Sequence, residues 1–151
     1  MAFLRNIVHM DLDTFFVSSE RLLDRRLNGK PILIGGTSDR GVVASCSYEA
    51  RRFGIHSAMP MKMAKERCPE AIVIKGNSET YSRYSRMVTE IIREASPLYE
   101  KMSVDEFYID FTGMDRFFGT LSTPLNCGKK SFEKQDCPFR LGCRKIKPFL
   151  K

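Results

Sequence analysis

The chain has 151 residues, of which 42% are apolar and 28% charged, so it is long enough for one ordinary domain or two small ones with a packed core. Its net charge of +7 is concentrated at one end, because residues 1–120 contain 17 Lys and Arg against 16 Asp and Glu, whereas residues 121–151 contain 8 against 2. The charge therefore predicts no nucleic-acid interface over the main part of the chain. The N-terminus lacks a signal-peptide pattern, and every apolar run is far shorter than the roughly 20 residues of a bilayer span. We therefore expect a cytoplasmic protein without a membrane contact.

The first half of the chain alternates short apolar runs with helical patterns. Strands are expected at Asn6–Asp11, Pro31–Ile34 and Gly41–Cys46. Helices are expected at Thr14–Leu23 and at Tyr48–Phe53, with Gly54 ending the second of them.

The second half predicts a helix at Met61–Arg67, a strand at Ala71–Ile74 and a strongly amphipathic helix at Thr80–Ala95. A turn at Ser103–Glu106 then leads into a strand at Phe107–Asp110. This order lacks a continuous parallel βαβα rhythm and so favours an α+β fold. No regular element is predicted beyond Gly119.

Acidic residues follow apolar strand residues at two places, Asp11 with Asp13 and Asp105 with Glu106. Clustered carboxylates raise one another's pKa, and a divalent cation offsets that cost. Oxygen ligands of this kind suit Mg²⁺, and two ions about 3.5–4 Å apart suit phosphoryl transfer. From spacing alone, solvated turn or cap residues are the favoured interpretation, and a metal site is the alternative. His9, inside an apolar strand, is interpreted as a structural histidine rather than a general base.

Four segments carry a resemblance to one enzyme family, in the order in which that family has them. His9–Glu20 (HMDLDTFFVSSE) and Ser103–Asp110 (SVDEFYID) are similar to the two acidic motifs of the Y-family translesion DNA polymerases. Between them, Ser47–Ile55 (SYEARRFGI) and Ser57–Pro60 (SAMP) resemble the family's fingers segment. The resemblance covers roughly residues 4–120 and points most to the bacterial polymerase IV branch.

The resemblance implies a catalytic and metal-binding set. Its members are the carboxylates Asp11, Asp105 and Glu106 and the backbone carbonyl of Leu12, which would bind two Mg²⁺ ions. The implied reaction is attack of a primer 3′-OH on the α-phosphate of a dNTP opposite a template base, including a damaged one. Ser103 is expected to support the acidic turn.

The resemblance also implies a nucleotide-binding set. Phe16 would exclude a ribose 2′-OH, and Phe15 would lie in the segment that packs around the incoming nucleotide. Tyr48 and Arg51, three residues apart on one helical face, would hold the triphosphate. Ser45 falls where the family often has a hydroxyl near the phosphates. For both Phe residues, plain core packing is the alternative.

The implied architecture is a polymerase palm with an antiparallel sheet and helices on one face, plus a small fingers subdomain. Residues 1–10 and 78–120 are expected to form a truncated, discontinuous palm, and residues 11–77 the fingers. Primed DNA and dNTP are the implied partners, with a sliding clamp reached through missing C-terminal regions. Because the palm would be truncated, exposed apolar surface is expected to support a homo-oligomer.

Residues 121–151 depart from the family pattern, and we interpret them as a tail outside it. The family's next palm helix, strand and phosphate-binding lysine are not readable there, and Asp136–Lys151 can be generated by reading a family-like coding sequence one nucleotide out of frame. We therefore predict a frameshift near residue 120, with an unrelated natural tail as the alternative. Five cysteines without a C-x-x-C pair predict neither a disulfide framework nor a zinc site. The chain alone is expected to have little or no polymerase activity.

Two other classes of function remain open. A nucleotidyl cyclase, or another palm-like two-metal enzyme, would share paired acids on adjacent strands but would prefer ribonucleotides. A non-catalytic nucleotide-binding module would keep the acids only as turn residues. Comparison of dATP with ATP, and of binding with and without Mg²⁺, separates these classes from a polymerase.

Overall fold

A computed structural model describes residues 6–96, 98–113, 139 and 141–145, and the chain divides into two compact units. One unit combines Met1–Asp13 with Ser82–Lys151, and the other is the continuous segment Thr14–Tyr81. The second boundary falls inside helix α4 (Ser78–Ala95), so this helix starts in one unit and continues into the other. The first unit is therefore discontinuous in sequence.

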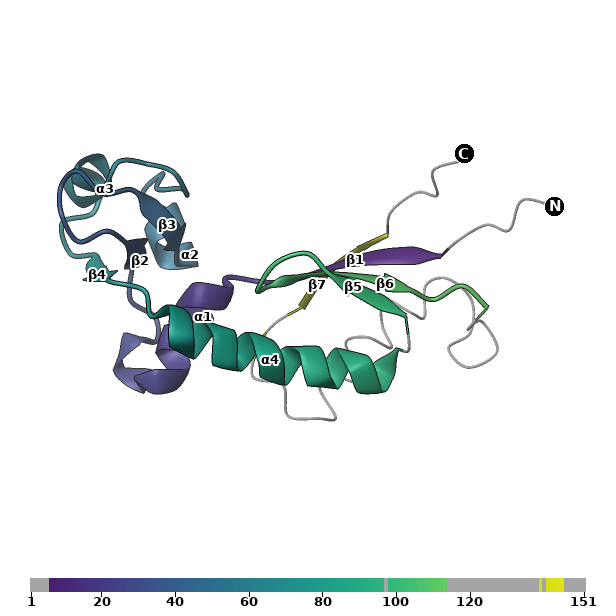
Figure 1. The fold of residues 1–151 in the computed structure, drawn as a ribbon. Coiled ribbons are helices and arrows are strands. Elements are labelled where there is room, and N and C mark those ends of the chain that lie inside the picture. Colours follow the sequence, from purple (N-terminus) through teal and green to yellow (C-terminus); the bar gives the residue numbers. More distant parts are fainter. Residues whose placement is uncertain (1–5, 97, 114–138, 140, 146–151) are drawn as a thin grey trace. The chain divides into compact units, whose positions relative to one another are not determined.

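The discontinuous unit contains a four-stranded sheet in the order β5-β6-β1-β7, in which every neighbouring pair is antiparallel. Its strands are β1 (Ile7–Leu12), β5 (Tyr99–Lys101), β6 (Glu106–Asp110) and β7 (Leu141–Lys145). Helix α4 runs along one face of this sheet (Figure 1). The antiparallel sheet with helix on one face confirms the predicted fold class.

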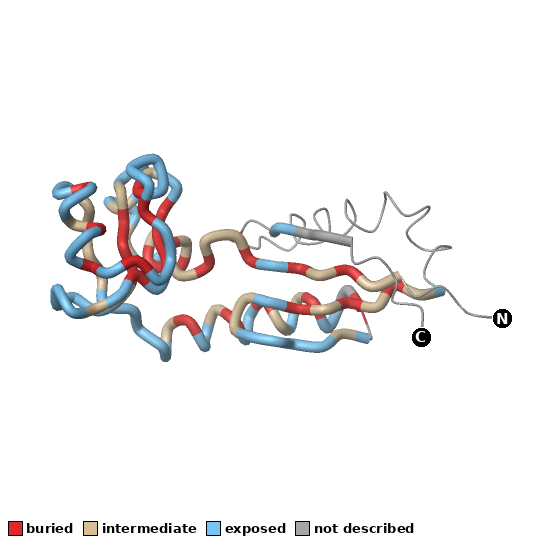
Figure 2. The backbone as a smooth tube through the Cα atoms, turned by 90° about the horizontal axis from the view of Figure 1, so that it is seen from above, coloured by how far each residue is buried: buried red, intermediate tan, exposed pale blue. Residues whose placement is uncertain are grey.

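Burial alternates along the central strands because successive side chains point to opposite faces of a sheet. In β1, Val8, Met10 and Leu12 are buried, and in β6 the buried residues are Phe107 and Ile109. Figure 2 shows this alternation as red segments between paler ones along the strands. Each such apolar side chain contributes about 1.5–3 kcal/mol through its transfer out of water.

The face of α4 that meets the sheet follows the helical repeat predicted from sequence. Val88 and Ile92 are fully buried, and Ser85, one turn earlier on the same face, is only 2% exposed. A serine within an apolar stripe is unusual, and its hydroxyl has two hydrogen-bond partners described below.

The continuous unit holds a three-stranded sheet in the order β3-β2-β4, with β2–β3 antiparallel and β2–β4 parallel. Its strands are β2 (Ile32–Gly35), β3 (Val43–Cys46) and β4 (Ile72–Ile74). Its helices are α1 (Phe15–Leu23), the 3₁₀ turn η1 (Arg25–Leu27), α2 (Tyr48–Arg51) and α3 (Met61–Arg67). The β2–β3 register shifts at Gly35, where a Cβ would lie 2.3 Å from the Val42 carbonyl oxygen, so only glycine fits.

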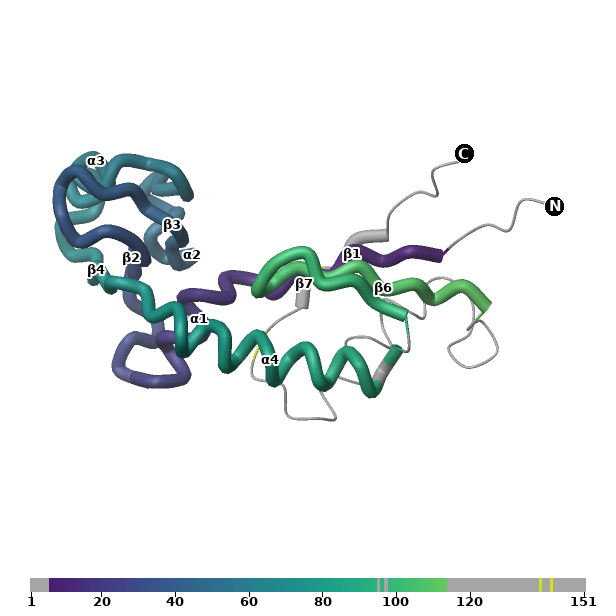
Figure 3. Tube along the Cα trace, in the orientation of Figure 1, coloured from purple at the N-terminus to yellow at the C-terminus, as the bar shows by residue number. Residues whose placement is uncertain are grey.

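Most predicted elements form within a few residues of their expected ends, and the chain trace in Figure 3 follows them in order. The predicted helix at Tyr48–Phe53 ends earlier, at Arg51. The prediction that no element follows Gly119 is wrong, since β7 pairs with β1 over residues 141–145. Its sequence, LGCRK, has only Leu141 and Cys143 in apolar alternation, which is too short a pattern to predict a strand, so the pairing with β1 identifies it.

The tail that we expected at residues 121–151 lies outside the described residues except for Phe139 and β7. Cys46 and Cys68 are free and buried. No helix in the described part of the chain is both long and apolar enough to cross a membrane.

Candidate active site

The carboxylates of the two acidic motifs lie on adjacent strands of the four-stranded sheet. Because Met10 and Leu12 of β1 are buried, Asp11 lies on the opposite face, away from the core. The register places Asp11 directly across from Glu106 of β6. Asp105 adjoins the same position, since its carbonyl oxygen accepts a hydrogen bond from the Leu12 amide at 3.0 Å. The pairing of β1 with β6 thus brings together residues about 95 positions apart in the sequence.

The electrostatics of this face follow from the like charges. The pKa of Asp11 is raised above its usual value, first by burial and then by the nearby charges of Asp105 and Glu106. His9 opposes this effect, and its Nε2 lies 4.0 Å from Glu106 Oε1. The His9 ring also packs against Tyr108, with ring centroids 5.0 Å apart. A bound cation would relieve the repulsion that raises the Asp11 pKa.

The donor set fits Mg²⁺ in its chemistry, because carboxylate oxygens are hard ligands. Within the described ranges, however, no three His, Cys, Asp or Glu side chains form a group that could hold a metal ion as they lie. The backbone therefore brings the acids close together without gathering their oxygens around one point.

The turn that carries Asp105 is held by two serines. Ser103 Oγ donates a hydrogen bond to Asp105 Oδ1 at 2.7 Å, which confirms the supporting role predicted for Ser103. Ser85 of α4 donates to the Val104 carbonyl at 2.6 Å. Because Val104 precedes Asp105, this hydrogen bond from Ser85 connects the acidic turn to helix α4.

Lys101 completes this support from the neighbouring strand. Its Nζ donates to Ser85 Oγ at 2.7 Å and to Thr89 Oγ1 at 3.1 Å, and it lies 5.6 Å from the centroid of the Phe107 ring. Burial lowers the pKa of Lys101, with a smaller contribution from Arg86. Sequence analysis did not identify Ser85 or Lys101; the polar residue within the apolar stripe of α4 was the only available signal.

The predicted gate residue lies in the continuous unit, at the start of α1. Phe16 is half-buried, and its ring meets the Tyr81 ring edge to face with centroids 4.7 Å apart. Phe15 is only 1% exposed, as expected of a core residue, and its ring lies 5.6 Å from that of Phe16. The residue before this pair, Thr14, has φ 45° and ψ 43°, a left-handed conformation that is strained for a β-branched residue.

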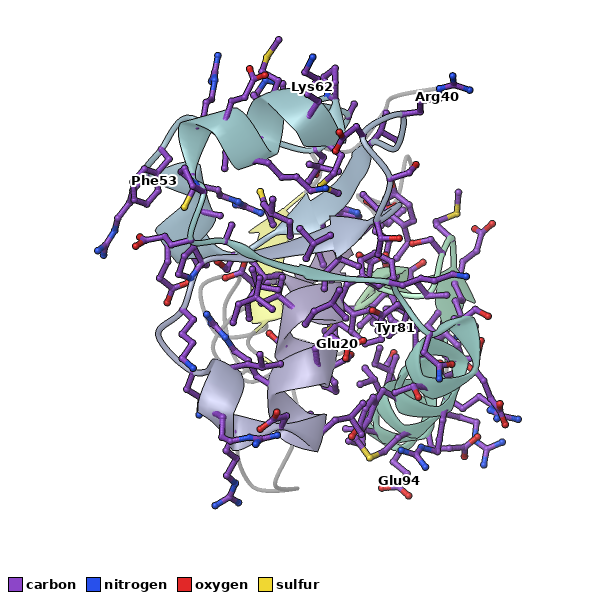
Figure 4. All side chains as sticks on the ribbon, turned by 90° about the vertical axis from the view of Figure 1, so that its left-hand side faces the viewer. Glu20, Arg40, Phe53, Lys62, Tyr81 and Glu94 are labelled. Atoms are coloured by element: carbon purple, nitrogen blue, oxygen red, sulfur yellow. The ribbon has the colours of Figure 1, made fainter. Side chains whose placement is uncertain are left out.

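Tyr81 itself was not predicted as a site residue. Its hydroxyl donates a hydrogen bond to Glu20 Oε1 at 2.7 Å, and Figure 4 shows the two labelled side chains together. Burial and the Glu20 carboxylate together raise the pKa of Tyr81 well above its usual range. The hydrogen bond to Glu20 thus fixes the hydroxyl end of Tyr81, and the Tyr81 ring packs against Phe16.

The predicted triphosphate residues lie on α2. Tyr48 and Arg51 are both exposed, and the Arg51 guanidinium carbon lies 4.9 Å from the centroid of the Tyr48 ring. Ser47 caps this helix by accepting a hydrogen bond from the Ala50 amide. Ser45 differs from the other two, because it is buried in β3 opposite Ile34.

The sequence matches one family model, described as the impB/mucB/samB family, over residues 10–144. Among curated proteins, it is 40% identical to DNA polymerase IV of Treponema denticola over 152 aligned positions, which cover 100% of this chain and 38% of that protein. It is 50% identical to DNA polymerase IV of Streptococcus suis over 112 residues, or 72% of this chain and 32% of that protein. The chain thus spans about a third of the length of these relatives.

Solved structures show the same fold. The insertion ternary complex of Dbh DNA polymerase matches with a TM-score of 0.82 and 24% identity, covering 93% of this chain and 42% of that one. DinB from Sulfolobus solfataricus matches with a TM-score of 0.78 and 26% identity, covering 92% and 42%. The family match continues to residue 144, beyond residue 120 where the motif resemblance ends. The predicted frameshift stays a prediction.

Proposed function

Because the chain belongs to the impB/mucB/samB family, that of the Y-family DNA polymerases, we propose that it forms the nucleotide- and metal-binding part of an enzyme that copies damaged DNA. The observation that carries this proposal is the register of Asp11 against Glu106, with Asp105 next to Glu106 in the sequence and near enough for its charge to raise the pKa of Asp11. Acids arranged in this way repel one another and so favour a cation.

Asp11, Asp105 and Glu106, with the backbone carbonyl of Leu12, are the groups that we propose to hold two Mg²⁺ ions. When bound, these ions would activate a primer 3′-OH and stabilise the charge on the triphosphate. The hydrogen bond from Ser103 would orient the Asp105 carboxylate, and Ser85 would hold the turn that presents it. A bound cation would stabilise the charged form of Asp11, whose pKa burial and the neighbouring carboxylates raise.

Nucleotide selection is assigned to the continuous unit. Tyr48 and Arg51 would contact the triphosphate, since both are exposed and a guanidinium binds phosphate oxygens in a bidentate manner. Ser45 would contribute only after a local change, because it is buried in β3. Phe16 would exclude a ribose 2′-OH, while the buried Phe15 supports it from beneath.

The whole enzyme's activity, partners and location are part of the same proposal. Primed DNA and dNTP would be its substrates, a sliding clamp would contact regions outside this chain, and the enzyme would act in the cytoplasm. Because the chain spans about a third of its relatives, it would lack most of the surface that binds duplex DNA through phosphates, and we expect little or no activity from it alone. Exposed palm surface would support association of copies.

Metal-dependent nucleotide binding tests this function directly. The chain is titrated with dATP and with ATP, in Mg²⁺ and in EDTA, and heats of binding are compared for the wild type, Asp105→Asn and Asp110→Asn. Asp110 is the matched control, because it also belongs to β6 but lies opposite Ile7, four residues from Glu106. We expect Mg²⁺-dependent binding of dATP that Asp105→Asn weakens and Asp110→Asn preserves.

The other outcomes identify the alternatives. A preference for ATP over dATP would indicate a cyclase-like enzyme that uses ribonucleotides. Binding that is the same in EDTA would indicate a nucleotide-binding module whose acids are only turn residues. Either result would refute the proposed polymerase site.

A further inference from the structure

Helix α2, which carries both proposed triphosphate residues, consists of a single turn, Tyr48–Arg51. One hydrogen-bonded turn is unstable by itself, because nucleation of a helix costs more than one turn returns. The orientation of Tyr48 and Arg51 therefore depends on the groups that anchor this turn to the rest of its unit.

Ser47 anchors the N-terminal end of the turn. It is fully buried, and its hydroxyl accepts hydrogen bonds from the amides of Ala50 and Ile32 at 3.3 and 3.0 Å. The same hydroxyl donates to the Lys30 carbonyl at 3.3 Å. The segment that ends at Lys30 is thus one support of α2.

Arg21 of α1 supplies the second anchor. Its guanidinium donates to the carbonyls of Leu27 and Lys30 at 3.3 and 3.1 Å, and to Glu49 Oε2 at 2.8 Å. The Arg21 and Glu49 side chains are 22% and 27% exposed, so the ion pair is largely shielded from water. One side chain therefore joins α1, the segment 27–30 and α2, a role that suits the rigid fork of arginine.

Glu49 is the one acidic residue of α2, and it lies between Tyr48 and Arg51 in the sequence. Burial raises the pKa of Glu49, but the hydrogen bonds from Arg21 and from the backbone outweigh this effect and hold the pKa below its usual value. The side chain is therefore an anion at neutral pH. An anion on a helix that binds a triphosphate would repel this ligand unless a nearby cation neutralises it.

We infer that Arg21 is a positioning residue for nucleotide binding, which fixes α2 and neutralises Glu49 so that Tyr48 and Arg51 can hold a triphosphate. This inference rests on the proposed function, since it assumes that α2 binds the nucleotide. Arg21 itself is not assigned a contact with the nucleotide. Its contribution is transmitted through Glu49 and through the Lys30 carbonyl, which it shares with Ser47.

The test compares the affinity of the whole chain for dATP and for dAMP, in the presence of Mg²⁺, across matched variants. Arg21→Met removes the cation, Arg21→Met/Glu49→Gln also removes the anion that it neutralises, and Arg21→Lys keeps the charge without the fork. Arg26→Met is the control, because Arg26 pairs only locally with Asp24, on the exposed side of η1. Thermal unfolding of each variant verifies that it is folded.

We expect Arg21→Met to raise the Kd for dATP about fivefold, the effect of one shielded ion pair. The Kd for dAMP should change by less than about twofold, because a monophosphate carries less charge to be repelled. Glu49→Gln in the Arg21→Met background should restore part of the lost affinity, Arg21→Lys should give an intermediate value, and Arg26→Met should bind like the wild type.

The inference is overturned if Arg21→Met binds dATP as tightly as the wild type. It is also overturned if dATP and dAMP lose affinity equally, or if Glu49→Gln restores nothing, since a purely structural role predicts those results. Absence of dATP binding by the wild type would instead refute the proposed nucleotide site. That outcome is recognisable before any variant is compared.

Discussion

Replacement of Ser85 by Ala should loosen the turn that carries Asp105. The Ser85 hydroxyl is buried, donates to the Val104 carbonyl at 2.6 Å and accepts from Lys101 at 2.7 Å. Loss of a buried hydrogen-bond donor leaves its acceptor unsatisfied, which costs about 1–3 kcal/mol. Lys101 keeps Thr89 as a partner, so most of that cost should come from Val104.

Two measurements follow from this variant. The free energy of unfolding in urea should fall by about 1–3 kcal/mol with an unchanged slope. The Leu12 amide, which donates to the Asp105 carbonyl, should exchange with solvent faster, whereas the Cys68 amide, which donates to the Ala64 carbonyl in the other unit, should not change. Thr89→Val is the matched variant, because it removes the other partner of Lys101 but leaves the bond to Val104. If Ser85→Ala changed stability by less than about 0.5 kcal/mol and left Leu12 exchange unaltered, the anchoring role would be refuted.

Three further predictions concern the proposed site. Because the pKa of folded Asp11 is raised above its unfolded value, ionisation of Asp11 reduces the stability of the fold as the pH rises through that pKa. Asp11→Asn should therefore raise the unfolding temperature at pH 7 but not near pH 3. An equal gain at both pH values would contradict the electrostatic cause. Phe16→Ala in a full-length enzyme should lower the preference for dNTP over rNTP by about tenfold or more, because the half-buried ring is the proposed barrier to the 2′-OH; unchanged discrimination would remove Phe16 from that role. The 151-residue chain should extend no primer in an Asp105-dependent manner, whereas a chain with the downstream domains should; Asp105-dependent synthesis by the short chain would disprove its predicted inactivity.

The parts of the fold that sequence could predict are those that local periodicity encodes. The apolar spacing of α4 and the alternation of β1 identify each element without reference to a partner. β7 could not be predicted in this way, because two apolar residues, Leu141 and Cys143, are too short an alternation to indicate a strand without its pairing to β1. Helix α2 ends at Arg51, earlier than predicted, because the residues after it form a turn that leads to Gly54 at φ 73°.

The candidate site also combines features that local motifs predict with features that depend on distant contacts. Motif spacing is enough to predict that Asp11 and Glu106 lie at strand ends, but their direct opposition depends on the register of two strands far apart in sequence. The hydrogen bonds of Ser85 to Val104 and of Arg21 to Glu49 span 19 and 28 residues, and no local pattern encodes such contacts. The polar Ser85 stands out in the apolar stripe of α4, but its partner and that of Arg21 are identified only by the structure.

The contact between Phe16, near the start of the continuous unit, and Tyr81, its last residue, has a consequence for how the chain folds. Phe16 and Tyr81 meet within that unit, so when the unit folds it holds together the two points at which it interrupts the other. The pairing of β1 with β6 would otherwise close a loop of about 95 residues, and prior folding of the insertion shortens the free part to about 27. The entropy saved in closing this loop is roughly 1 kcal/mol. We therefore expect the continuous unit, Thr14–Tyr81, to fold first, and strands β1 and β6, which carry the carboxylates, to pair afterwards.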